Sequence, residues 1–88
     1  MDTIKVCKGS KSYDAQVKNV DGKKISAYVK IDKNDGFIPK VTALYEMQDE
    51  KNVKCVAEGQ ERDIELISYT SIRDSKLYQI IDMTILLA

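Results

Sequence analysis

The fold is decided by residues 3–32, which read TIKVCKGSKSYDAQVKNVDGKKISAYVKID. The Gly9-Ser10 pair suits a two-residue type II′ hairpin, because glycine reaches the positive φ that the first turn position needs. This turn pairs two strands residue by residue, as Lys8 with Lys11, Val6 with Tyr13 and Ile4 with Ala15. The apolar residues of both strands then lie on one face.

A second turn is predicted at Asn19-Val20-Asp21-Gly22, which has the residues of a type I turn followed by a left-handed glycine. A three-residue loop there pairs Asn19 with Lys23, Val17 with Ile25, Ala15 with Ala27 and Tyr13 with Val29. A two-residue loop at Asp21-Gly22 would instead set Val17 against Ser26 and Lys18 against Ile25. We reject that register because it mixes apolar and polar side chains on one face.

The two registers agree on a buried face and an exposed face of a three-stranded sheet. The buried face contains Ile4, Val6, Tyr13, Ala15, Val17, Ile25, Ala27, Val29 and Ile31. The exposed face contains Thr3, Lys5, Cys7, Ser12, Asp14, Gln16, Lys18, Lys24, Ser26, Tyr28 and Lys30. A slip of one residue would mix the two sets, so the faces of these strands are fixed by the sequence.

Residues 39–50 fit two structures. A helix would begin at Pro39 and bury Val41, Leu44 and Tyr45, whereas a strand would alternate Val41, Ala43, Tyr45 and Met47. Charge favours the strand, because Lys40 would lie at the positive end of the helix and Glu46, Asp49 and Glu50 near its negative end. Each such charge costs about 0.3–1 kcal/mol when it is exposed.

Three more strands are predicted after a charged loop at 49–52. They are Val53–Ala57, Ile64–Tyr69 and the segment 76–87, where Leu77, Gln79, Ile81, Met83 and Ile85 alternate. Asp74-Ser75 would cap a helix over that last segment, but the alternation favours a strand. Apolar residues on both faces of Ile64–Tyr69 indicate a strand inside the sheet.

Short strands at spacings of roughly ten residues indicate an all-β fold, a small barrel or sandwich of SH3-like or OB-like type. We expect six or seven antiparallel strands, with one short helix near 39–50 as the alternative. The 88 residues make one small domain, 1–88, which has little core to enclose a deep active site.

The N-terminal residues lack an apolar stretch of signal-peptide length, and no run approaches the roughly 20 apolar residues of a membrane span. We therefore expect a cytoplasmic protein that does not bind membranes. The same context favours free thiols at Cys7 and Cys55 over a disulfide.

The sequence offers little catalytic chemistry. It contains no histidine and only two cysteines, which removes the usual general base and the common zinc sites. Asp32–Gly36 resembles the start of a calcium loop, but Ala43 stands where the bidentate glutamate is needed. Asp63 and Glu65 share a strand face and are interpreted as a solvated acidic edge. We predict no catalytic residue, no cofactor, no metal and no enzymatic activity.

One candidate binding surface is predicted on the exposed face of the first sheet, at Lys18, Lys24, Tyr28 and Lys30. An aromatic ring among lysines is typical of proteins that hold single-stranded nucleic acid by base stacking and phosphate attraction. The predicted position of Asp14 opposite Tyr28 weakens this hypothesis. A nucleic-acid-binding barrel is therefore the alternative function.

The favoured function is a non-catalytic protein–protein interaction or structural assembly module. Residues 1–44 contain nine lysines and five aspartates, whereas residues 45–88 contain five basic and nine acidic residues. Opposite charges in the two halves favour association with another protein or with copies of the same chain. The apolar end Ile85–Ala88 would be packed as a final strand or buried in another subunit. Small lysine- and isoleucine-rich domains of this kind are typical of phages and mobile elements.

Overall fold

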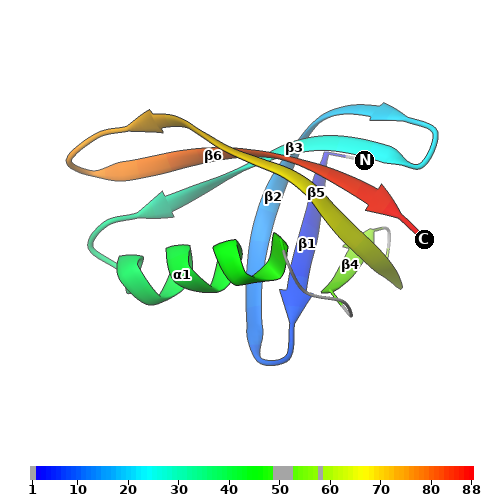
Figure 1. The fold of residues 1–88 in the computed structure, drawn as a ribbon, viewed down its shortest axis with the longest axis horizontal. Coiled ribbons are helices and arrows are strands. Elements are labelled where there is room, and N and C mark those ends of the chain that lie inside the picture. Colours follow the sequence, from blue (N-terminus) through cyan, green and yellow to red (C-terminus); the bar gives the residue numbers. More distant parts are fainter. Residues whose placement is uncertain (1, 49–52, 58) are drawn as a thin grey trace.

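The structure is a computed structural model that describes residues 2–48, 53–57 and 59–88. These residues form six strands and one helix (Figure 1): β1 (Thr3–Lys8), β2 (Lys11–Asp21), β3 (Lys24–Asp32), α1 (Phe37–Gln48), β4 (Val53–Ala57), β5 (Gln60–Asp74) and β6 (Tyr78–Leu87). The expected charged loop at 49–52 lies outside the described residues. No helix in the described part of the chain has the length and apolar character needed to cross a membrane.

The strands form a closed antiparallel barrel in the order β1-β2-β3-β6-β5-β4. This order makes two three-stranded meanders, β1–β3 and β4–β6, which each form half of the wall and are joined by α1. The prediction of a small all-β barrel is confirmed. An OB fold is a five-stranded Greek-key barrel, so the likeness to it ends at size and closure.

The first hairpin has the predicted register. Lys8 pairs with Lys11, Val6 with Tyr13 and Ile4 with Ala15. Gly9 has a φ of 59°, a left-handed conformation that costs glycine little and other residues more. Local turn chemistry therefore fixes this register.

The second hairpin has a different register from the predicted one. The turn is the two-residue Gly22-Lys23, so that Asp21 pairs with Lys24 and Val17 pairs with Ala27 instead of Ile25. A β-bulge at Lys18 inserts one extra residue between these pairs. The shorter turn alone would reverse which residues face the core, and the extra residue of the bulge reverses them again. The predicted buried face is therefore correct although the predicted pairing is wrong.

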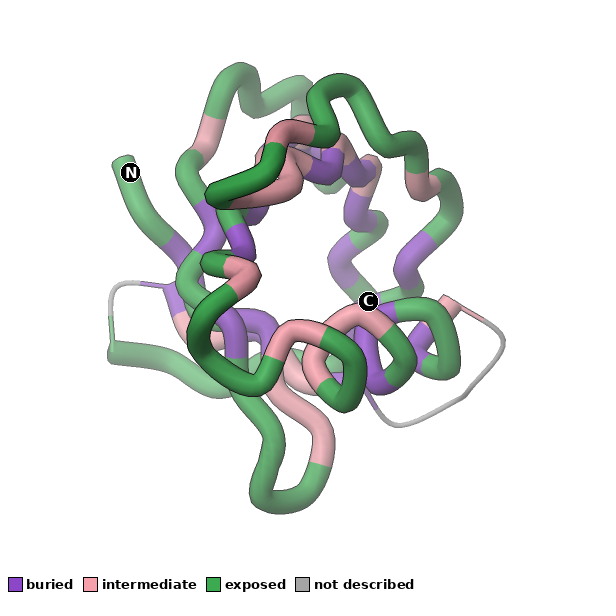
Figure 2. The backbone as a smooth tube through the Cα atoms, turned by 90° about the vertical axis from the view of Figure 1, so that its left-hand side faces the viewer, coloured by how far each residue is buried: buried purple, intermediate pink, exposed green. Residues whose placement is uncertain are grey.

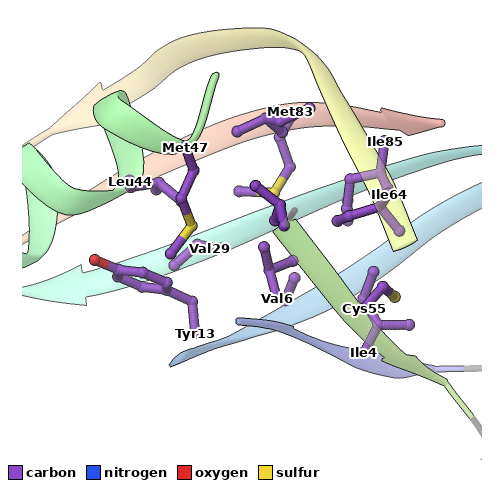
Figure 3. Packing of buried hydrophobic residues seen from close by; sticks show 14 of the residues in the cluster. Ile4, Val6, Tyr13, Val29, Leu44, Met47, Cys55, Ile64, Met83 and Ile85 are labelled. Atoms are coloured by element: carbon purple, nitrogen blue, oxygen red, sulfur yellow. The ribbon is translucent and has the colours of Figure 1, made fainter. Parts of the chain in front are cut away.

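The core lies inside the barrel and draws on every element. Of the predicted buried face, only Val17 is half-buried, and the other eight residues are buried. The second meander and α1 add Val53, Cys55, Ala57, Ile64, Leu66, Ile81, Met83, Ile85 and Leu87, with Ala43, Leu44 and Met47. Figure 3 shows Leu44 and Met47 directed from α1 toward Tyr13 and Val29. No charged or polar residue is buried among those described.

The strand predicted at 39–50 is wrong, because Phe37–Gln48 is a helix. Beyond Gln16 and Tyr28 the strands β2 and β3 no longer pair, and the end of the barrel opens there. Figures 1 and 2 show α1 lying along this mouth, with buried segments lining the inside of the ring of strands. The Tyr13 hydroxyl donates a hydrogen bond to the Lys40 carbonyl and ties β2 to the helix.

Packing outweighs charge in this helix. Burial of a leucine or methionine side chain contributes about 1.5–3 kcal/mol, and Leu44 and Met47 are both fully buried. An unfavourable charge at an exposed helix end costs only about 0.3–1 kcal/mol. Lys40 is also matched by Asp35, with Nζ 2.8 Å from Oδ2. The helical alternative had placed Tyr45 in the core, but Tyr45 is 55% exposed.

The last two strands confirm the strand predictions at 64–69 and 76–87: β5 is longer than predicted, and β6 begins two residues later, at Tyr78. β5 continues to Asp74, and its second half pairs with the start of β6. We call residues 68–82 the arm, because this hairpin reaches past the barrel wall on the left of Figure 1. Ile85 and Leu87 are buried at the other end of β6, so the apolar C-terminal segment packs as a final strand.

We predict that Leu44→Ala lowers the free energy of unfolding by about 2–5 kcal/mol, because the side chain leaves a cavity in the closed mouth. Thr42→Ala, on the exposed side of the same helix, should change it by less than about 0.5 kcal/mol. Urea denaturation followed by circular dichroism measures both. Equal, small effects would show that α1 does not stabilise the barrel.

Candidate functional site

The predicted binding surface lies on the outer wall of the first meander. Its residues are Lys18 on β2 and Lys24, Tyr28 and Lys30 on β3. The corrected register sets Tyr28 opposite Gln16 instead of the predicted Asp14. On its other side, β3 pairs with β6, a contact that sequence reasoning missed. The role of this surface stays a prediction.

Lys18 forms an ion pair with Asp82, an acidic residue of β6. Its Nζ lies 2.8 Å from Asp82 Oδ2, and Asp82 stands opposite Tyr28 on β6. The ion pair joins the two meanders and neutralises one lysine of the predicted surface. Asp82 Oδ1 is buried and has no hydrogen-bond partner among the described residues. This pair lines a groove together with Ser26, Ala27, Ser68, Thr70, Ile72, Met83 and Thr84.

Lys30 is placed over an aromatic ring. Its Nζ lies 4.5 Å from the ring centre of Tyr78, and the Arg73 guanidinium carbon lies 5.6 Å from the same centre. Such cation–π contacts contribute about 0.5–1 kcal/mol at exposed sites. The alternation over 76–87 implied that Tyr78 faces outward, but only the pairing of β3 with β6 brings it to Lys30.

A second groove runs between β2 and β3 where these strands separate. We call it the seam and define it by the facing segments Lys11–Ala15 of β2 and Val29–Asp32 of β3. The groove is lined by Ser12, Tyr13, Asp14, Val29, Lys30, Ile31 and Asp32, together with Asp35 and Lys40 at the start of α1. The seam therefore has two strands as walls and the beginning of a helix beneath it.

Three tyrosines meet where α1 crosses the barrel mouth. The rings of Tyr45 and Tyr69 are tilted with centres 4.2 Å apart. The Tyr69 hydroxyl is buried without a partner among the described residues. Desolvation, with smaller contributions from Tyr45 and Tyr13, raises the pKa of Tyr69 to about 12.

Large apolar side chains are exposed mainly on α1 and on the arm. Ile38 and Tyr45 on α1 are 71% and 55% exposed, and Ile72 and Leu77 on the arm are 54% and 65% exposed. Figure 1 shows the start of α1 and the tip of the arm at the same end of the molecule. We call Ile38, Tyr45 and Leu77 the apolar end, whereas Ile72 lines the groove beside Lys18 and Asp82.

The two cysteines are free and lie on opposite faces of the barrel wall. Cys55 is buried and pairs with Val6, whereas Cys7 points outward and is half-buried. Desolvation is the main cause that raises the pKa of both thiols. A raised pKa disfavours the nucleophilic thiolate near neutral pH.

The remaining acidic candidates are used in local contacts. Asp63 accepts a hydrogen bond from Lys54, which raises the pKa of the lysine. Asp32 Oδ1 accepts the Asn34 N–H at 2.8 Å, an Asx turn that leads into α1. A hydrogen bond from Lys40 holds the pKa of Asp35 below its usual range. No group of three or more histidine, cysteine or acidic side chains gathers within the described residues.

Comparison with known proteins gave no match: no family model, no curated sequence and no solved structure is significantly similar to this chain. The function is therefore inferred from the geometry of the described residues.

Two tyrosine variants compare the stability effect of a hydrogen-bonded hydroxyl with that of a buried hydroxyl that has no described partner. Tyr13→Phe removes the hydrogen bond to Lys40 and should lower the free energy of unfolding by about 0.5–1.5 kcal/mol. Tyr69→Phe removes a hydroxyl that has no described partner and should leave stability unchanged or raise it. Urea denaturation compares them, and a larger loss in Tyr69→Phe would contradict this assignment.

The same hydroxyl predicts how stability changes in alkali. The pKa of Tyr69 rises from 10.0 to about 12 on folding, so the folded state keeps the proton that the unfolded state loses. The free energy of unfolding that is linked to this proton is fully present below pH 10 and is lost as the pH rises toward 12. Denaturation over this range should show a weaker pH dependence in Tyr69→Phe than in the parent chain. An identical dependence would contradict the burial of this phenol.

Proposed function

We propose that the chain is a non-catalytic protein–protein interaction or structural assembly module. It acts through its surface, in association with another protein or with copies of itself. The small lysine- and isoleucine-rich composition is in keeping with an assembly part or inhibitor encoded by a phage or mobile element.

The observation that carries this proposal is the apolar end. Exposed apolar groups that gather on one part of a surface mark interaction sites more often than scattered ones do. Three of the seven large apolar side chains exposed in the described residues, Ile38, Tyr45 and Leu77, belong to the apolar end. Charged residues flank them, including the ion pair between Lys33 and Asp74. An apolar centre with a charged surround has the composition of a protein interface.

The distribution of charge supports association. The basic half of the sequence supplies the first meander, and most of the acidic half supplies the second, which forms the other side of the wall. Opposite charge on two sides of one small barrel attracts copies in a head-to-tail arrangement. This attraction is screened at high salt, where the Debye length falls to about 3 Å.

We predict that Ile38→Ser with Leu77→Ser reduces self-association, or association with a captured partner protein. The variant removes two apolar contacts without changing charge. Each lost side chain is worth about 1.5–3 kcal/mol if it is fully covered in the complex. Sedimentation velocity at low and high salt measures the change.

The matched control is Val20→Ser with Leu86→Ser, which alters two exposed apolar residues outside α1 and the arm. Association should persist in this control and weaken with salt. A chain that remains monomeric and captures no protein partner would contradict the proposal. Equal effects in the two variants would contradict the apolar end as the contact surface.

A second candidate function is the binding of single-stranded nucleic acid on the outer face of β3 and β6. The observation that favours it is Tyr78 between the exposed cations Lys30 and Arg73, on the same face as Tyr28. It ranks second because phosphate neutralisation dominates such affinity. Lys18 and Lys33 are already paired with Asp82 and Asp74, and the net charge is zero.

This alternative predicts that Tyr28→Ala with Tyr78→Ala weakens binding of a labelled single-stranded oligonucleotide. Base stacking contributes about 1–3 kcal/mol per base, so the loss should be at least about fivefold in fluorescence anisotropy. Tyr45→Ala, an exposed tyrosine on α1, serves as the control. Equal binding by all three proteins, or none by the parent chain, would exclude this candidate.

A further inference from the structure

Two strand segments at the seam lack a neighbour on one side. β2 pairs with β1 from Lys11 to Gln16 and with β3 only from Gln16 onward. β3 pairs with β6 along its whole length but with β2 only up to Tyr28. Among the described residues, no strand pairs with the seam side of Lys11–Ala15 or Val29–Asp32. Alternate backbone groups of each segment therefore face the groove, because an antiparallel strand bonds to its two neighbours in turn.

These segments are regular strands, unlike the free edge of β5. β5 pairs with β4 only from Gln60 to Ile64, so its second half also has an open side. That half carries two bulges, at Ile67 and Ile72. Bulges are a common means of preventing a free edge from pairing with another chain. The pairings of β1 with β2 and of β3 with β6 contain no such irregularity, so the seam edges are competent to accept a strand.

We propose that the seam binds an extended, basic segment of a partner protein by strand addition to β3 or β2. This inference rests on the proposed function as a protein-interaction module and names its partner by chemistry. Unpaired N–H and C=O groups along an edge are complementary to an extended backbone, which supplies affinity in this mode of recognition.

The charges of the lining decide the sign of the segment. Three aspartates and two lysines line the groove: Asp14, Asp32, Asp35, Lys30 and Lys40. Lys40 is matched by Asp35, and Lys30 is drawn toward the Tyr78 ring. Asp14 is only weakly paired, with an oxygen 3.9 Å from Lys5 Nζ. Lys11 at the start of the β2 segment adds a third lysine. Asp14 and Asp32 are the exposed carboxylates that lie on the two open edges, and they favour lysine or arginine at alternate positions of the bound segment.

The experiment uses the full chain and a blocked synthetic peptide of about ten residues that alternates lysine and valine. Binding is followed by titration calorimetry, and the site by amide hydrogen exchange in NMR. We expect new protection of alternate amides in Lys11–Ala15 or Val29–Asp32. Replacing the two central valines of the peptide by proline should abolish binding, because proline lacks the backbone donor.

The test variant is Asp14→Lys with Asp32→Lys, which reverses two exposed charges at the seam. It should weaken peptide binding by about tenfold or more, which corresponds to about 1.4 kcal/mol. The matched control is Asp21→Lys with Glu65→Lys, which makes the same change of charge at exposed positions elsewhere. This control should bind the peptide within about threefold of the parent chain, a shift of less than 1 kcal/mol.

Protection at the seam that is lost in the test variant alone supports the proposal. Absence of binding at millimolar peptide, protection elsewhere, or equal weakening in both variants overturns it. The seam and the apolar end are tested separately, because the charge variants leave Ile38 and Leu77 in place. If the peptide does not bind at the seam but Ile38→Ser with Leu77→Ser still reduces association, the proposed function stands. If neither result is obtained, the proposed function is contradicted.

Discussion

The packing of Leu44 and Met47 into the barrel mouth is the contact on which the rest of the structure depends. β2 changes partner from β1 to β3 at Gln16, so the wall opens on the far side of that residue. Two fully buried side chains of α1 fill the opening, and the Tyr13 hydroxyl fastens the helix to β2. The helix covers the core at the mouth but forms no strand pairing with β2 or β3. The core is therefore sealed while backbone groups of β2 and β3 remain available at the seam.

The same arrangement supports the proposal that the chain acts through its surface. The described residues bury no charged side chain, and Asp63, Asp35 and Asp32 are bound to Lys54, Lys40 and the Asn34 amide. Two further ion pairs, Lys18 with Asp82 and Lys33 with Asp74, link the chain before α1 to the second meander. The pair with Asp82 neutralises Lys18, one of the three lysines predicted to bind nucleic acid. The apolar end and the seam are left as the surfaces best suited to a protein partner.

How much the sequence revealed depends on the range of the interaction. The Gly9-Ser10 turn is local, and its register was predicted correctly. At Gly22 a bulge at Lys18 compensates for a shorter turn, so the buried face was right although the pairing was wrong. The helix was kept only as the alternative at 39–50, because the gap between strands that favours it depends on long-range pairing. The roles of Asp82 and Tyr78 were missed because β6 pairs with β3 although the two strands lie far apart in the sequence.

Amide hydrogen exchange of the free protein, resolved by residue in NMR, tests the central claim most directly. β6 is paired on both sides, so its amides should be the slowest to exchange. Along β3, protection should be continuous over Lys24–Tyr28 and should alternate over Val29–Asp32, where amides that face the seam exchange rapidly. Uniform protection from Lys24 to Asp32, together with protection over Lys11–Ala15 on both sides, would show that β2 and β3 pair throughout. It would contradict the open seam and the role of α1 in closing the mouth.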